Sequence, residues 1–264
     1  EDKKKESGAK KEKGKIKIKV KKSKYDKNQK SDSSIAMAKK ILSEARRVGY
    51  YQWEVNTRNN LITSYCFKGD YKSAKENLKF LETFIKPSKD SSDYADMYGN
   101  YGMMYGMQNK YDTSIQFYEK SIGIDERHNN KAGLPGSYSN IAIGFQQLSN
   151  FPQALFYQQK SLKLAEDAKD EVSQAYTLGN LGITYTQILD SAKSEQAYKK
   201  SILLAQKNEL KDVELYAYTN LSSLYINQSK WKEGYEFAMK SASLAEKMGD
   251  LGIQASSLSK ASVS

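Results

Sequence analysis

Residues 176–201 read YTLGNLGITYTQILDSAKSEQAYKKS, and this stretch decides the fold. Asn180 is followed by the aromatic Tyr185, then by the small residue Ser194 and by the pair Lys200-Ser201. Apolar side chains such as Tyr198 and Ile202 recur at four-residue spacing, which is the spacing of one face of an α-helix. The stretch therefore predicts two amphipathic helices separated by a short turn.

The same pattern returns every 40 residues along the chain. The repeated asparagines are Asn60, Asn100, Asn140, Asn180 and Asn220. Five residues after each stands an aromatic side chain: Tyr65, Tyr105, Phe145, Tyr185 and Tyr225. Farther on comes a small residue that lets two helices approach closely: Ala74, Ser114, Ala154, Ser194 and Gly234. A single helical hairpin cannot bury its apolar face alone, so we expect an all-α fold in which neighbouring hairpins stack.

The helices are expected at regular positions. First helices are predicted near 50–67, 92–108, 131–148, 171–188 and 211–228. Second helices are predicted near 33–47, 71–86, 111–126, 151–168, 191–208 and 231–247, and residues 249–262 begin another first helix. Pro152 falls in the first turn of its helix, where its missing amide hydrogen costs nothing, and Pro87 and Pro135 fall between helix pairs.

Charge divides the chain of 264 residues into two parts. Residues 1–30 hold 14 Lys against 5 acids, whereas the remainder holds 28 Lys and Arg against 26 acids. We expect 1–30 to be a disordered, Lys-rich segment and 31–264 to be an array of about five full repeats plus partial ends. The first residue is Glu1, which suggests a processed chain or an excised piece, and the array is expected to be cut or capped by another segment at its end. No run of about 18 apolar residues is present, so no membrane span is expected.

The residues needed for catalysis are scarce. His128 is the only histidine, lies in a polar junction and is expected at the surface, so it cannot build a triad or a metal site. Cys66 lies on an apolar helix and is expected to be a small core residue. We therefore expect no enzymatic activity, no cofactor and no metal.

Two stretches carry a family resemblance. Asn100-Tyr101-Gly102 with Tyr105 and Ser114, and Asn180-Leu181-Gly182 with Tyr185 and Ser194, resemble the tetratricopeptide-repeat consensus. The long repeats are similar to those of kinesin light chains, Rap-type receptors and the sensory arrays of Bacteroidetes-type histidine kinases. The resemblance implies a right-handed superhelical solenoid of antiparallel helix pairs that binds peptides and serves as the input or scaffold region of a larger bacterial signalling protein.

The resemblance also implies a binding site on the first helices. The five asparagines would point into the concave groove, where an Asn side chain offers one acceptor and two donors to the main chain of a peptide. The alternative is that each Asn fixes the adjoining repeat by bonding to backbone at the hairpin junction. Specificity would come from neighbouring positions on the same face, namely Asn56, Asp96, Gly136, Tyr176, Tyr216, Thr63, Met103, Ile143, Ile183 and Ser223.

Three kinds of partner follow from these features. The expected partner is a protein or peptide ligand in the concave groove. The alternatives are self-association through the open C-terminal repeat and binding of an anionic polymer by the basic tail, with nucleic acid the less favoured partner because the body is nearly neutral. The sequence leaves open a periplasmic or other extracytoplasmic location and a cytoplasmic one.

Overall fold

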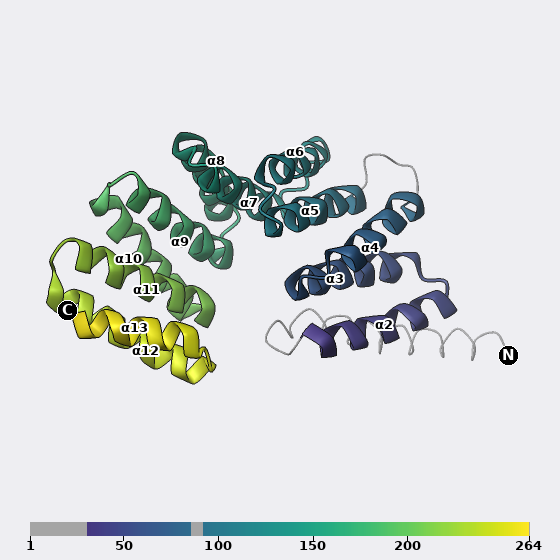
Figure 1. Ribbon diagram of the computed structural model, residues 1–264. Helices are drawn as coiled ribbons and strands as arrows, with labels where there is room; N and C mark the ends of the chain where they lie inside the picture. Colours follow the sequence, from purple (N-terminus) through teal and green to yellow (C-terminus); the bar gives the residue numbers. More distant parts are fainter. Residues whose placement is uncertain (1–30, 86–91, 264) are drawn as a thin grey trace. The chain divides into compact units, whose positions relative to one another are not determined.

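The computed structural model describes residues 31–85 and 92–263, and every regular element in these ranges is an α-helix (Figure 1). The bounds are α2 Ser31–Arg47, α3 Tyr51–Lys68, α4 Tyr71–Phe84, α5 Ser92–Met107, α6 Tyr111–Arg127, α7 Leu134–Gln147, α8 Phe151–Asp167, α9 Glu171–Gln187, α10 Ser191–Lys207, α11 Lys211–Asn227, α12 Trp231–Met248 and α13 Leu251–Val263. The all-α class of fold is confirmed.

The helices fall into two compact units, residues Glu1–His128 with α2–α6 and Asn129–Ser264 with α7–α13. Within each unit every helix packs against the next one in sequence. The first helices also touch one another, α3 against α5 in one unit and α7, α9, α11 and α13 in succession in the other. Each unit is therefore a stack of helical hairpins.

Every helix in the array stops in the same way. A residue with positive φ, in the left-handed region, recurs at intervals of 20 residues: Gly49, Gly69, Asn109, Asn129, Ser149, Lys169, Leu189, Glu209, Ser229 and Gly249. At Leu189 the amide of the next residue, Asp190, donates to the carbonyl of Tyr185 at 2.9 Å, and the amide of Leu189 itself donates to Thr186 at 3.1 Å. This pair of hydrogen bonds is the Schellman motif, which satisfies carbonyl groups at a helix end.

Four of the following helices begin with a side-chain cap. Asp70, Asn150, Asp170 and Asp190 each accept a hydrogen bond from the backbone amide three residues later, at 3.0 to 3.3 Å. A cap of this kind satisfies one of the free amide groups of the first turn. The expected role of the breaks at Gly69-Asp70 and Ser149-Asn150, to end one helix and cap the next, is confirmed.

The small residues of the repeat hold the two helices of a pair together. Ser114 and Ser194 donate to the carbonyl oxygens of Gly102 and Gly182, at 2.7 and 2.9 Å. The serines of the Lys-Ser pairs form a second row of such contacts, in which Ser121, Ser161 and Ser201 donate to Ala95, Pro135 and Ala175 at 2.7 to 2.8 Å. Each repeat of this kind is therefore fastened through hydroxyl groups to the backbone of its first helix.

Two of the expected boundaries are wrong. Helix α7 begins at Leu134 rather than at 131, and Pro135 lies in its first turn rather than between helix pairs. The reason is that residues 131–133 form a turn, and a proline, which lacks an amide hydrogen, favours the first turn of a helix. Helix α4 ends at Phe84. Pro87 and the basic segment 1–30 lie outside the described residues, so the expectations for them remain predictions.

Candidate functional site

The candidate site lies on the first helices of the second unit. We name as the asparagine face the side chains that α7, α9 and α11 present away from their second helices: Asn140, Ile143, Tyr176, Asn180, Ile183, Tyr216, Asn220 and Ser223. Tyr216 is 63% exposed and Tyr176 is 40% exposed, whereas the flanking Leu215 and Ala217 are buried. None of the eight residues is charged, so this face offers amide, hydroxyl, aromatic and aliphatic groups.

Part of the polar surface of this face is already paired. The Tyr176 hydroxyl donates to the Asp212 carboxylate at 2.7 Å, and burial together with this hydrogen bond raises the Tyr176 pKa. The Ser223 hydroxyl donates to the carbonyl oxygen of Thr219 in its own helix at 3.1 Å. Tyr216 is thus the aromatic residue that the face presents most openly.

The first unit carries the corresponding residues on α3 and α5. Asn60, Thr63, Asn100 and Met103 are half-buried, and the Thr63 hydroxyl donates to the carbonyl oxygen of Asn59 at 3.0 Å. Met103 packs against the apolar core of this unit. Asn56 is half-buried there and Asp96 is exposed, while Gly136, their counterpart on α7, is exposed.

Two asparagines hold the preceding first helix. Asn100 Nδ2 donates to Asn59 Oδ1 at 2.9 Å, and Asn180 Nδ2 donates to Ser139 Oγ at 3.2 Å. The alternative of a bond to backbone at the hairpin junction therefore has a different form at these two positions. The contact joins side chains on neighbouring first helices.

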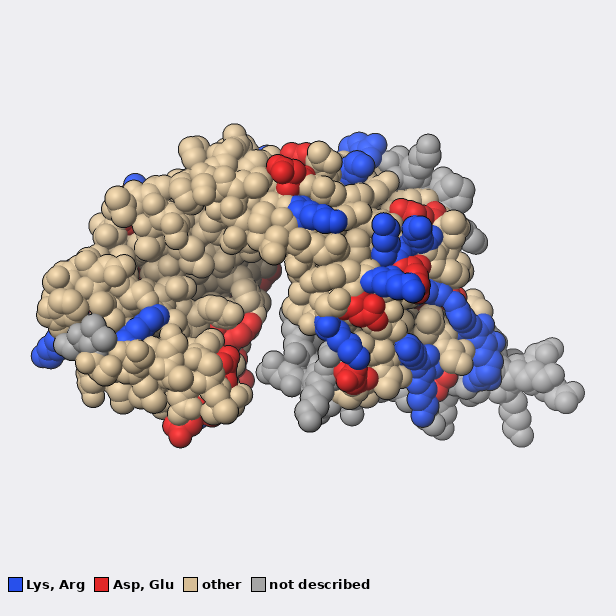
Figure 2. Space-filling view, viewed as in Figure 1, with Lys and Arg blue, Asp and Glu red and all other residues tan. Residues whose placement is uncertain are grey.

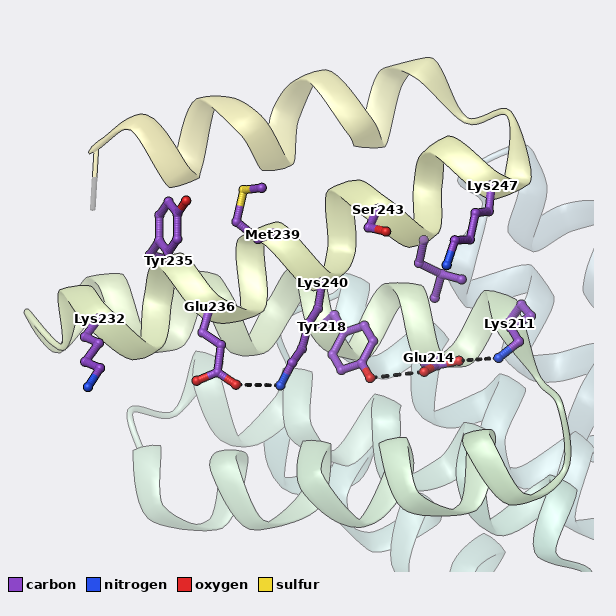
Figure 3. Close-up of a pocket in the computed structure, with 11 residues that line it drawn as sticks. Lys211, Glu214, Tyr218, Lys232, Tyr235, Glu236, Met239, Lys240, Ser243 and Lys247 are labelled. Carbon is purple, nitrogen blue, oxygen red and sulfur yellow. Dashed lines mark hydrogen bonds and ion pairs between the residues drawn. The ribbon is translucent and has the colours of Figure 1, made fainter.

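A separate open groove of about 880 Å³ lies on α11 and α12 (Figure 3). The sequence analysis missed it. Its walls combine four lysines, two glutamates and apolar groups: Lys211, Glu214, Tyr218, Lys232, Tyr235, Glu236, Met239, Lys240, Ser243, Leu244 and Lys247. Glu214 and Tyr218 lie roughly half a turn around α11 from Asn220, because successive helical residues are about 100° apart. The groove and the asparagine face are therefore on different sides of this helix.

Ion pairs occupy much of the charge in this groove. Lys211 contacts Glu214 at 2.9 Å and Lys240 contacts Glu236 at 2.6 Å (Figure 3). Burial raises the pKa of Glu214, but hydrogen bonds from Lys211, Gln206 and Tyr218 outweigh it and hold the pKa below its usual value. Glu214 is therefore a fixed anion that ties α10 to α11.

The residues considered for catalysis occupy the expected places. Cys66 is buried, and burial raises the pKa of its thiol to about 11. His128 is exposed at the end of α6. Among the described residues no group of His, Cys, Asp and Glu is arranged to hold a metal ion. None of the helices in 31–85 and 92–263 is long and apolar enough to cross a membrane.

Charge is unevenly spread over the surface. Figure 2 shows lysine and arginine gathered over α2–α4, while the visible face of α8–α13 is largely uncharged. Uncharged surface over the second unit agrees with the composition of the asparagine face.

Comparison with known proteins supports the class of fold. A family model of the tetratricopeptide repeat matches residues 95–128. The search of curated proteins found no match. The fold is that of tetratricopeptide-repeat proteins, which generally act as non-catalytic scaffolds for protein interaction.

Solved structures agree with this assignment at low sequence identity. BtubC from P. vanneervenii has a TM-score of 0.70 and 19% identity, over 84% of this chain and 93% of that one. A signal transduction ATPase with a tetratricopeptide repeat sensor, from Pyrococcus horikoshii, has a TM-score of 0.73 and 17% identity, over 86% of this chain but 34% of that one. NprR, a quorum sensor from B. thuringiensis, was solved in complex with its cognate peptide NprX and has a TM-score of 0.57 and 13% identity, over 93% and 77% of the two chains. The chain therefore contains a tetratricopeptide repeat within a fold of that class, which confirms the resemblance.

Proposed function

We propose that this chain is a non-catalytic module that binds an extended peptide segment of another protein across the asparagine face. The observation that carries the proposal is Tyr216, an aromatic side chain 63% exposed among uncharged amide and aliphatic groups. Tyrosine is enriched in protein interfaces because it combines a large apolar ring with a polar hydroxyl. A peptide could pack against this ring while asparagine amides bind its main chain.

The kind of ligand follows from the uncharged character of the face. Without Lys or Arg among its eight residues, the asparagine face has no group with which to grip a carboxylate. Recognition would then depend on main-chain hydrogen bonds and on apolar contacts to Ile143, Ile183 and Tyr176. The peptide complex of NprR, which shares this fold, supports a ligand of this chemical class.

We further propose that peptide binding serves signalling. A sensory or scaffold region of a larger bacterial protein, such as a sensor histidine kinase, is the setting that the resemblance suggests. The tetratricopeptide repeat sensor of the P. horikoshii ATPase and the quorum sensor NprR support an input role for this fold. A ligand can shift a conformational equilibrium only through a difference in its affinity for the two states, and a stack of repeats offers many small angles at which such states can differ.

The proposal is tested by selecting peptides on the whole chain. A phage-displayed library of random 12-residue peptides is panned against it, and fluorescence anisotropy measures the Kd of enriched peptides. Tyr216→Ala should weaken binding about tenfold, because removing an interface aromatic commonly costs more than 1 kcal/mol. The matched control is Tyr235→Ala on α12, since Tyr235 is 50% exposed but lines the other groove.

Two results would overturn the proposal. One is a panning experiment in which no peptide is enriched over a control protein. The other is binding that Tyr235→Ala abolishes and Tyr216→Ala leaves unchanged, which would move the site to the groove of α11 and α12.

A second candidate function is self-association through α13. Leu258 is 46% exposed, whereas Tyr218 and Leu178, at the same position one and two repeats earlier, are buried. Leu251, at the start of α13, is 74% exposed. A second copy of the chain could cover this face. Analytical ultracentrifugation would then show a dimer whose fraction rises with concentration and that Leu258→Lys disrupts; a monomer at all concentrations would exclude it.

A further inference from the structure

The asparagines of the repeat are not equivalent. Asn180 donates to the hydroxyl of Ser139, which lies 41 residues earlier on the neighbouring first helix, at 3.2 Å. Asn100 donates to Asn59, again 41 residues earlier, at 2.9 Å. In both cases the preceding first helix supplies a side-chain oxygen as acceptor. The amide nitrogen of these two asparagines is therefore engaged within the protein.

Asn220 has no such acceptor. The residue 41 positions before it is Gly179, which has no side chain, although α9 and α11 are in contact. Asn140 is similarly preceded by Gly99. Among the described residues, neither Asn140 nor Asn220 makes a side-chain hydrogen bond, and Asn140 is exposed. Bound and available asparagines thus alternate along the chain with a period of 80 residues.

Packing does not require glycine at these two positions. A Cβ at Gly179 would have its nearest neighbour, Ser201 Oγ, at 3.4 Å, and a Cβ at Gly99 would lie 3.6 Å from Ser121 Oγ. Both glycines lie inside helices, where glycine is a poor residue because it leaves the unfolded chain most freedom. By contrast, a Cβ at Gly182 would come within 3.0 Å of the Tyr198 ring. Glycine at 99 and 179 has one clear effect, which is to withhold an acceptor from the next asparagine.

We infer that Asn140 and Asn220 bind the ligand, while Asn100 and Asn180 brace neighbouring first helices. This inference rests on the proposed peptide-binding function and assigns its anchor residues. Packed helices lie about 8–10 Å apart, so Asn140 and Asn220, two first helices apart on α7 and α11, are separated by roughly 16–20 Å. An extended chain rises about 3.3 Å per residue. The ligand is therefore an extended peptide whose main-chain amide groups, about five or six residues apart, bind the two asparagines.

The decisive variant leaves every asparagine in place. Gly179→Ser supplies Asn220 with the hydroxyl that Ser139 supplies to Asn180, so Asn220 should become engaged within the protein. Binding of a peptide selected from the random 12-residue library should then weaken roughly threefold to tenfold, the effect of one lost hydrogen bond. Gly179→Ala is the matched control, because it adds the same Cβ without an acceptor and should leave the Kd unchanged.

Substitution of the asparagines gives the second comparison. Asn220→Ala should weaken peptide binding as much as Gly179→Ser, whereas Asn180→Ala should lower the melting temperature and leave the Kd nearly unchanged. Ser139→Gly should release Asn180 and preserve or improve binding. Circular dichroism melting of each variant verifies that it folds.

A measurement without ligand separates this inference from the proposed function. Side-chain amide exchange, measured by NMR, should be slower for Asn180 than for Asn220, and Gly179→Ser should slow Asn220. The inference fails if the two exchange alike, or if Asn180→Ala and Asn220→Ala weaken the same peptide equally. Failure of the peptide function would be seen differently, as the absence of any peptide whose binding depends on Tyr216.

Discussion

The ring of Tyr198 lies over Gly182, where the two helices of the pair α9–α10 approach each other. A Cβ at Gly182 would fall within 3.0 Å of three ring carbons, and the same holds for Gly102 beneath Tyr118. In the repeat between them the corresponding residues are Ala142 and Gln158. A large side chain on the second helix is thus matched by a small or absent one on the first.

Gly182→Ala should therefore destabilise the chain. Overpacking of this kind costs about 1–3 kcal/mol, which exceeds the roughly 1 kcal/mol that alanine gains over glycine as a helix former. Urea unfolding measures the change. Gly179→Ala, three residues away with room for its methyl group, should stabilise the chain instead, and equal effects of the two substitutions would contradict this explanation of Gly182.

Leu189→Gly should stabilise the protein. Leu189 has φ of 63° and is 87% exposed, so its side chain contributes little packing while its backbone is in a conformation unfavourable for L-residues. Relief of that strain is worth about 1 kcal/mol. Thermal unfolding should show a higher Tm. Gly69→Ala, at the equivalent stop with φ of 79°, should lower it, and an unchanged Tm in both variants would show that the left-handed turns carry no strain.

Glu214→Gln should weaken the dependence of stability on acidic pH. Because the folded pKa of Glu214 is held below its usual 4.5, the carboxylate stabilises the fold fully above that value. This contribution is lost as the pH falls through the lower folded pKa. The wild-type Tm should therefore fall more steeply than that of the variant between about pH 5 and pH 3. Parallel curves would mean that Glu214 titrates alike in the folded and unfolded chain.

Gln158→Leu should raise stability. Gln158 is fully buried opposite Ala142, and neither Oε1 nor Nε2 has a hydrogen-bond partner among the described residues. A buried amide without partners costs about 1–3 kcal/mol, so leucine, of similar length, should gain about 1–2 kcal/mol in chemical unfolding. The control is Gln153→Leu at an exposed position of the same helix. A loss of stability for Gln158→Leu would indicate that its amide is hydrogen-bonded in solution.

The 40-residue register accounts for what the sequence predicts well. Asn180, Tyr185 and Ser194 mark one hairpin, and their recurrence places most helix boundaries within one or two residues of those observed. This works because helix periodicity, turn residues and small contact residues are local features of the chain. The exception at α7 arises where Pro135 competes with the register.

The distinction between asparagines could not be predicted in the same way. Whether Asn180 or Asn220 is available depends on residues 139 and 179, which come from another helix and meet the asparagine only in the stack. The left-handed turn at Leu189 also gave no signal, since leucine is not a residue expected there and hydrogen bonds to Tyr185 and Thr186 compensate for its strain.

The helix stops, spaced by 20 residues, make the chain divisible in two unequal senses. Removal of 40 residues, for example 171–210, would rejoin identical turns and keep each remaining helix in its own role, so a shorter protein should still unfold cooperatively. Removal of 171–190 alone would also rejoin identical turns, yet it would place a second helix where a first helix belongs and set lysines against an apolar neighbour. Circular dichroism of the two deletions should therefore show a folded chain in one case and a largely unfolded downstream region in the other, although both cuts respect every turn.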